Sequence, residues 1–181
     1  MKAITLYQPY ATLCCLGLKV DETRSWPTTY RGPLAIHAAR TEPRSCYNAY
    51  LEKKLWWPIL GSEIPAGQSF GVIEMLLGWK FLPRGGVIGT VELVGCVATD
   101  KRRREIGSFQ MMVVEHKRRK TMTIKQRDLG DYANGRWAWL FENPVLLDKM
   151  VAAKGQPRIW NLDDCLVARM TGWQEPEESR T

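Results

Sequence analysis

The chain has 181 residues, of which 45% are hydrophobic and 25% are charged. These proportions fit a folded globular protein and exclude collagen-like, coiled-coil and low-complexity chains. A chain of this length buries roughly 70% of the surface that its unfolded form exposes, so its core needs neither disulfides nor a structural metal.

The charge is unevenly balanced: 26 Lys and Arg stand against 19 Asp and Glu, a formal net charge of +7. This excess favours an acidic partner such as nucleic acid and is equally compatible with a basic enzyme. The five cysteines show no C-x-x-C spacing, so we expect no metal or cofactor and a reducing, cytoplasmic location. With no signal peptide and no apolar run of roughly 20 residues, we expect no membrane partner.

The first elements follow from turn and helix signals. A strand is predicted over Lys2–Leu6, and Pro9 suits the first position of a helix that runs through Leu16. Gly17 provides the left-handed residue that ends such a helix. A second strand is expected over Val20–Trp26.

The third predicted strand, Leu34–Ala38, alternates between two faces. Leu34, Ile36 and Ala38 share one apolar face, which places His37 on the other. Downstream we expect two helices in an insertion near 41–82, a long strand, a basic insertion near 100–131, two further strands and a last helix capped by Asn161. Their ranges are Pro43–Trp57, Phe70–Leu77, Val87–Thr99, Arg136–Glu142, Val145–Val151 and a helix ending at Met170.

These elements predict an α+β fold. Single helices and turns separate the strands without regular βαβ alternation, which favours a mixed β-barrel with flanking helices over a parallel doubly wound sheet. We expect one domain over 1–170 and a frayed acidic tail at 171–181.

The most informative motif lies between the first helix and the second strand. A helix ended by glycine delivers Lys19 to the start of a strand on which Glu22 and Arg24 share a face. Such a cluster can bind a phosphate or a base edge, and a carboxylate between two cations can also act as an acid or base. An exposed ion-pair ladder remains the alternative, and spacing favours it.

The spacing Gly17, Lys19, Glu22 and Arg24 resembles the G-x-K-x-x-E-x-R signature of the ASCH domain (activating signal cointegrator 1 homology). Other blocks agree with this family: Leu6–Ala11 (L-Y-Q-P-Y-A), Glu22–Trp26 (E-T-R-S-W), Tyr30–Ala39, Gly89–Leu93 and Lys154–Trp160 (K-G-Q-P-R-I-W). The resemblance runs through most of residues 1–162, except within the two insertions.

The resemblance implies a PUA-like β-barrel whose cleft includes the signature residues, and it implies RNA or DNA binding. One branch of the family hydrolyses N4-acetylcytidine with a Lys and a Thr of this motif, and another member has been linked to ribonuclease activity. Glu22 stands where that amidohydrolase branch has its threonine, which argues against the same nucleophilic route. Thr23 cannot substitute, because strand alternation points it to the opposite face.

We therefore expect a protein that binds nucleic acid, RNA in preference to DNA, and that reads a base. A carboxylate at Glu22 can accept from an exocyclic amine, while Lys19 and Arg24 donate to carbonyl or phosphate oxygens. Gln8 is a further candidate contact, Trp26 or Tyr10 can stack on a base, and His37 can line the cleft. For Gln8 a satisfied turn amide is an equal alternative, for Trp26 core packing is, and for His37 a structural hydrogen bond is favoured.

The basic insertion holds ten Lys or Arg against five acids and is expected to contact the phosphate backbone. Its candidate contacts flank a loop or hairpin and are Arg102, Arg103, Arg104, Lys117, Arg118 and Arg119. Two alternatives stay open: a hydrolase of an acylated cytidine or of RNA, with Glu22 as general base and Lys19 as electrostatic stabiliser, and a regulatory protein-interaction module. A modified nucleoside is an alternative ligand.

Overall fold

The computed structural model describes residues 1–41, 82–105, 108–115 and 118–170. The predicted helices Pro43–Trp57 and Phe70–Leu77, together with His116, Lys117 and the tail at 171–181, lie outside these residues.

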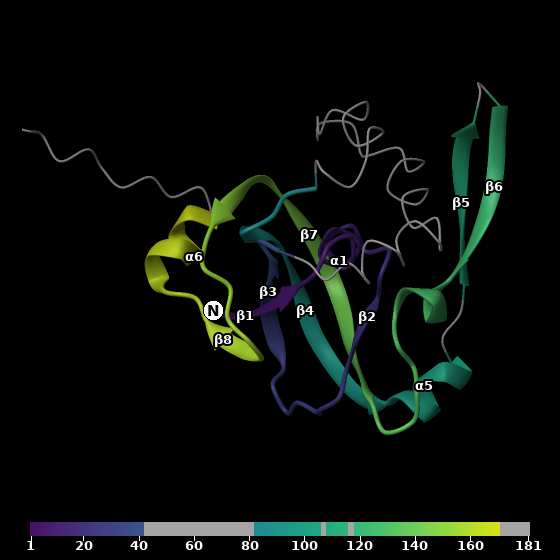
Figure 1. Cartoon of the computed structure of the whole chain (residues 1–181), viewed down its shortest axis with the longest axis horizontal. Coiled ribbons are helices and arrows are strands. Elements are labelled where there is room, and N and C mark those ends of the chain that lie inside the picture. The colour runs from purple at the N-terminus through teal and green to yellow at the C-terminus, as the bar shows by residue number, and fades with distance from the viewer. Residues whose placement is uncertain (42–81, 106–107, 116–117, 171–181) are drawn as a thin grey trace, which may run out of the picture.

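A curled six-stranded sheet forms the body of the protein (Figure 1). Its strand order is β2-β7-β4-β3-β1-β8, in which β1 and β3 run parallel and all other neighbours run antiparallel. This half-barrel with helices against it confirms the predicted α+β class and mixed barrel. The strand bounds are β1 Lys2–Leu6, β2 Asp21–Arg24, β3 Gly32–Ala38, β4 Gly86–Ala98, β7 Trp137–Ala152 and β8 Ile159–Asn161.

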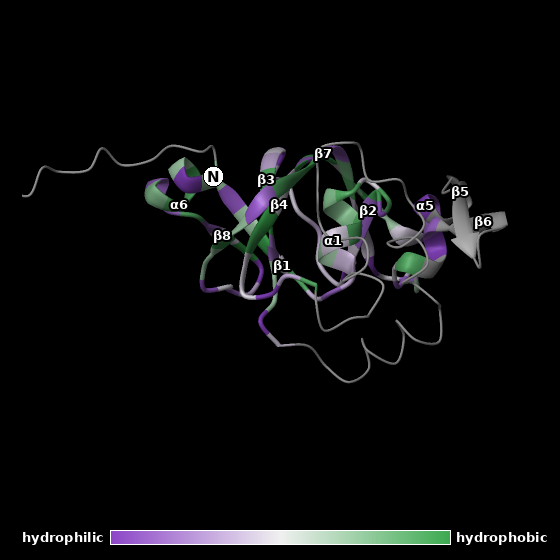
Figure 2. Cartoon of the chain, turned by 90° about the horizontal axis from the view of Figure 1, so that it is seen from above, coloured by the Kyte–Doolittle hydropathy of each residue, from purple (hydrophilic) through white to green (hydrophobic). Residues whose placement is uncertain are grey.

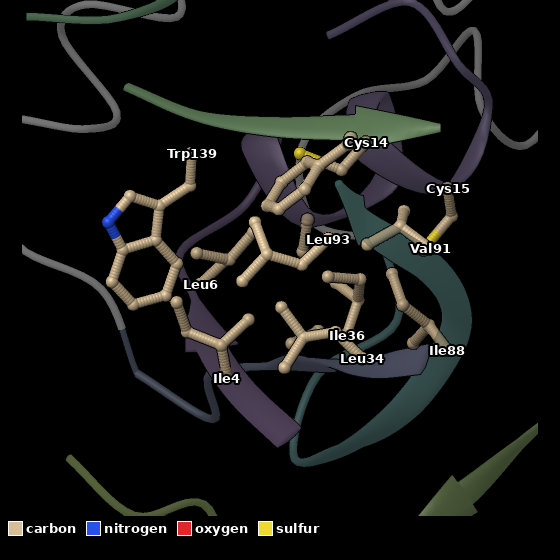
Figure 3. Close-up of a cluster of buried hydrophobic side chains, with 13 residues drawn as sticks. Ile4, Leu6, Cys14, Cys15, Leu34, Ile36, Ile88, Val91, Leu93 and Trp139 are labelled. Carbon is tan, nitrogen blue, oxygen red and sulfur yellow. The ribbon is translucent and has the colours of Figure 1, made fainter. Parts of the chain in front are cut away.

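The core lies between the inner face of the sheet and helix α1 (Tyr10–Cys15). Figure 3 shows side chains from β1, β3, β4 and β7 converging beneath this helix. Ile4, Leu34, Ile36 and Trp139 are at most 1% exposed, and burying such a side chain fully contributes about 1.5–3 kcal/mol. The predicted apolar face of β3 is thereby confirmed. Figure 2 shows apolar residues concentrated along β4 and around α1.

The C-terminal helix α6 (Asp164–Met170) begins later than the sequence predicts. Asn161 was the expected cap, and this prediction is wrong, because Asn161 is the last residue of β8. The cap is Asp163, whose Oδ1 accepts the backbone N–H of Leu166 at 2.7 Å. Helix α6 packs against β7 at the end of the molecule farthest from the β5–β6 hairpin (Figure 1).

The basic insertion begins with α5 (Thr99–Glu105), continues as a hairpin of β5 (Ser108–Glu115) and β6 (Arg118–Lys125), and ends with the 3₁₀ turn η2 (Gln126–Leu129). The hairpin forms a separate two-stranded sheet that projects from the half-barrel (Figure 1). Glu115 pairs with Arg118 beside the turn, whereas Ser108 pairs with Lys125 at the base near α5. The basic runs 101–104 and 118–120 therefore lie at opposite ends of the hairpin.

Candidate functional site

The end of α1 delivers Lys19 to the site. Gly17 adopts a φ of +71°, and the N–H groups of Gly17 and Leu18 donate to the carbonyl oxygens of Cys14 and Leu13. These bonds satisfy carbonyls that a helix end would otherwise leave unpaired, as the sequence predicts for a glycine stop. The chain then turns directly into β2.

Alternation along β2 divides its side chains between the two faces of the sheet. Glu22 lies opposite Trp139 and Arg24 opposite Trp137 in the antiparallel ladder with β7, so both share the inner face with the core tryptophan. The polar cluster thus forms the margin of the hydrophobic core. This position explains why Lys19 is only 1% exposed.

The three signature side chains form one ion-pair chain, which confirms their predicted convergence. Lys19 Nζ lies 3.1 Å from Glu22 Oε2, and Arg24 Nε lies 3.3 Å from Glu22 Oε1. The Lys19 ammonium also donates to the carbonyl oxygen of Asp21. Burial is the largest single effect on the pKa of Lys19 and lowers it, but the charges of Glu22, Cys14 and Asp21 and the hydrogen bond to Glu22 together outweigh it. The pKa is therefore raised, and Lys19 stays protonated.

Arg24 connects this cluster to the other side of the half-barrel. Its Nη2 donates to the carbonyl oxygen of Thr5 in β1 at 3.1 Å, although β1 and β2 are not neighbours in the sheet. The guanidinium is thus held between Glu22 and β1. The Arg24 side chain also lines the adjacent pocket. A guanidinium has five N–H donors, so some of them remain for a ligand there.

This pocket encloses about 1160 Å³. Its walls come from the ends of β1, β3 and β7, from the segment before β4, from Arg24 and from the loop at 153–158. Five cationic side chains line it: Arg24, Arg40, Arg84, Lys154 and Arg158. Among the described lining residues there is no Asp or Glu, so these lining side chains carry a net positive charge.

His37 lines the same pocket from the outer face of β3, where alternation predicts it. Its Nε2 lies 3.0 Å from the carbonyl oxygen of Ala153, and a carbonyl can only accept, so Nε2 carries the proton and donates. Nδ1 is buried and has no hydrogen-bond partner among the residues that the structure describes. Burial lowers the pKa of His37, which keeps the ring neutral near pH 7.

The opposite face of β2 anchors the basic insertion. Asp21 is fully buried and accepts hydrogen bonds from the Tyr132 hydroxyl and, at 2.9 Å, from Arg102 Nε. Arg102 was predicted as a phosphate contact, but this bond ties it to β2. The Arg102 side chain thus joins α5 to the sheet.

Two other predicted contacts have partners within the chain. Gln8 is fully buried, its Nε2 donates to Pro83 O at 2.8 Å, and its Oε1 accepts from the backbone N–H and the hydroxyl of Thr12. Trp26 packs edge-on against Trp139, with ring centroids 4.6 Å apart. Gln8 therefore acts as a structural amide and Trp26 as a core-packing side chain.

Other predicted residues are placed only in part. Arg103, Arg104, Arg118 and Arg119 have a described backbone in α5 and β6, whereas Lys117 lies outside the described residues. Within the described chain, no group of three or more His, Cys, Asp or Glu is arranged to hold a metal ion. Nor is any helix there long and apolar enough to cross a lipid bilayer.

Sequence reasoning missed most of the cations of the pocket. Arg40 follows β3 and Arg84 precedes β4, and only the pairing of β3 with β4 brings the two residues together. Lys154 and Arg158 belong to the K-G-Q-P-R-I-W block, but that motif by itself does not predict that the two residues line a pocket. Tyr7, which is 45% exposed on the pocket wall, was likewise missed.

Comparisons with known proteins agree with the sequence resemblance. A family model described as the ASCH domain matches residues 4–149. Activating signal cointegrator 1 from Homo sapiens is 22% identical over 160 residues, and the protein of the same name from Mus musculus is 22% identical over 162 residues. Each match covers 88% of this chain and 22% of the relative, so the chain spans about a fifth of those proteins.

Two crystal structures of mutant ZmASCH proteins from Zymomonas mobilis are also similar. Both have a TM-score of 0.48, with sequence identities of 13% and 14%. The matches cover 94% of this chain and 96% and 94% of those chains.

We predict that Glu22→Gln lowers the free energy of unfolding by about 3 kcal/mol, because it leaves the buried Lys19 cation without its charged partner. Urea unfolding monitored by tryptophan fluorescence measures the change. Asp131→Asn is the matched control, since Asp131 pairs with Arg136 at 3.3 Å while 60% exposed, and its loss should cost under about 1 kcal/mol. Equal losses in the two variants would contradict the role of the buried pair.

A second prediction concerns pH. The folded-state pKa of His37 is lowered by burial, whereas the unfolded chain titrates near 6.5. As the pH falls through about 6.5 towards the folded-state pKa, His37 binds a proton in the unfolded chain but not in the folded protein. The free energy of unfolding therefore decreases over this range. His37→Gln should therefore lose less stability between pH 7.5 and 5 than the wild type. His116→Gln, which removes the other histidine, is the control, and parallel curves for all three proteins would refute the assignment.

Proposed function

The chain belongs to the ASCH domain family, and on that premise we propose that it binds nucleic acid, RNA in preference to DNA, in the cationic pocket beside Arg24. The family is associated with nucleic-acid binding. The observation that carries the proposal is the fixed guanidinium of Arg24, held by Glu22 and Thr5 at the wall of a pocket with four further cations.

The three signature residues then divide the work. Lys19 is too deeply buried to contact a nucleic-acid strand, and its role is to hold the carboxylate of Glu22 in place. Glu22 in turn orients the guanidinium of Arg24. A preoriented Arg loses less freedom when it binds, and its planar donors suit the paired acceptors of a base edge or a phosphate. Glu22 is 15% exposed, and a carboxylate offers about four acceptor sites, so it can also accept from an exocyclic amine.

The pocket wall also offers an aromatic surface. Tyr7 is 45% exposed there, and an unpaired base can stack on such a ring without sequence preference. Bases stack in this way when they are unpaired, which favours single-stranded RNA over a duplex as the ligand.

The hydrolase alternative depends on which of Lys19 and Glu22 can transfer a proton. Lys19 retains its proton and can serve only as an electrostatic stabiliser, which leaves any proton transfer to Glu22. Both oxygens of Glu22 already face cations. Binding that needs no turnover is therefore the simpler use of this geometry.

The test is a fluorescence-anisotropy titration with single-stranded RNA, an RNA stem-loop and duplex DNA at two salt concentrations. We expect single-stranded RNA to bind most tightly, and Arg24→Gln to weaken it about tenfold, which corresponds to about 1.4 kcal/mol. The same variant should reduce the slope of log K against log salt by about 0.7, the contribution of one phosphate on a single strand.

Arg31→Gln is the matched control, because Arg31 is exposed, does not line the pocket, and donates to the carbonyl oxygens of Thr28 and Tyr30. It should bind RNA as the wild type does. Unchanged binding in Arg24→Gln would sink the proposal, and shortening of the RNA during the titration would favour the hydrolase.

The basic insertion gives a separate prediction. The double variant Arg103→Glu and Arg104→Glu should lower the affinity for all three nucleic acids by a similar factor, because contacts to the phosphate backbone carry no sequence information. Arg102 stays intact in this variant because it anchors α5. Lys149→Glu, on an exposed position of β7, is the control for a charge reversal elsewhere. A loss confined to one of the three ligands would contradict a backbone role.

A further inference from the structure

We infer that the cationic pocket takes the phosphorylated end of a nucleic-acid strand, with the terminal phosphate monoester among Lys154, Arg158 and the other cations. This inference rests on the proposed function and narrows its ligand from a strand in general to a strand end.

The first argument is charge density. An internal phosphodiester brings one negative charge, whereas a monoester brings about 1.5 to 2 near pH 7 together with three strong acceptor oxygens. Proteins that follow a strand place their cations along a groove. Here five cations from β2, from the end of β3, from the segment before β4 and from one loop converge on a single pocket. Convergence of this kind suits one dense anion.

The second argument is that the loop at 153–158 is held in place before any ligand arrives. The Ala153 carbonyl accepts from His37 Nε2, the Gln156 carbonyl accepts from Thr5 Oγ1 at 2.9 Å, and the Ala153 N–H donates to Gly85 O at 3.3 Å. The backbone that carries the cations of this loop therefore needs little further ordering on binding.

Gly155 lets this loop lie directly on His37. A Cβ at this position would stand 2.5 Å from His37 Cε1 and 3.0 Å from Thr5 Oγ1, so only glycine fits without a shift. Close packing at Gly155 fixes the backbone on the C-terminal side of Lys154.

Arg158 adds a third observation, since its φ is +60°. Non-glycine residues seldom adopt this left-handed conformation, and such strained residues cluster where a side chain must be aimed at a ligand. Two described non-glycine residues have a positive φ, Asn143 and Arg158, and of these only Arg158 lines the pocket.

Size and an aromatic wall agree with a terminal nucleotide. The volume of about 1160 Å³ lies just above the range of about 300–1,000 Å³ seen for small-ligand pockets. The exposed Tyr7 ring can carry the terminal base while its phosphate reaches the cations.

The experiment compares 10-nucleotide single-stranded RNAs of one sequence that differ only at one end. In the first pair, one RNA has a 5′-phosphate and the other a 5′-hydroxyl, and both carry the fluorophore at the 3′ end. In the second pair, one RNA has a 3′-phosphate and the other a 3′-hydroxyl, and both carry the fluorophore at the 5′ end. We expect one terminal phosphate to raise affinity at least tenfold in 0.15 M salt. The double variant Lys154→Gln and Arg158→Gln should abolish that gain, while Lys149→Gln, outside the pocket, should keep it.

The outcomes separate the two proposals. Equal affinity for phosphorylated and hydroxyl ends would overturn this inference and leave nucleic-acid binding intact, whereas no binding of any strand would overturn both. A gain that persists in the double variant would place the strand end elsewhere and also overturn the inference. If circular dichroism shows that the double variant is unfolded, Arg40→Gln replaces it, with the same loss of gain expected.

Discussion

The carboxylate of Glu22 is the point on which the site depends. It faces a buried ammonium on one side and a guanidinium on the other, at 3.1 and 3.3 Å. Without it, Lys19 would be an unpaired charge at the margin of the core, which is strongly destabilising. Through Arg24, the same carboxylate reaches the backbone of β1 across the open side of the half-barrel. The ion pair therefore helps to fix the direction of the guanidinium between β2 and β1.

The neighbouring carboxylate has the complementary task on the outer face. Asp21 holds Arg102 of α5 and Tyr132, which follows the hairpin, so both ends of the basic insertion are fastened to β2. Consecutive acids on one short strand thus serve different parts of the protein. The inner acid orients the pocket, and the outer acid fixes the root of the projecting hairpin. This division follows directly from the two-residue period of a β-strand.

Local signals made much of the fold predictable. The bounds of β1, the stop at Gly17, the facing of His37 and the convergence of Lys19, Glu22 and Arg24 all follow from helix capping and strand alternation. Burial and partner choice did not follow. The engagement of Arg102 by Asp21 and the gathering of Arg40 with Arg158 depend on strand pairings between distant segments, which spacing does not encode. Asn161 was misassigned because β8 extends through it and leaves the cap to Asp163.

The separation of the β5–β6 hairpin from the main sheet bears on how this protein can change over evolutionary time. The ladder of the six-stranded sheet does not continue into the hairpin strands, which pair with each other. No hairpin residue is among the described residues that line the pocket, so replacements in the hairpin can change its charge while the pocket keeps its shape. If the protein binds nucleic acid as proposed, strength of attraction and choice of ligand are inherited as separate traits, and selection can adjust the first without disturbing the second.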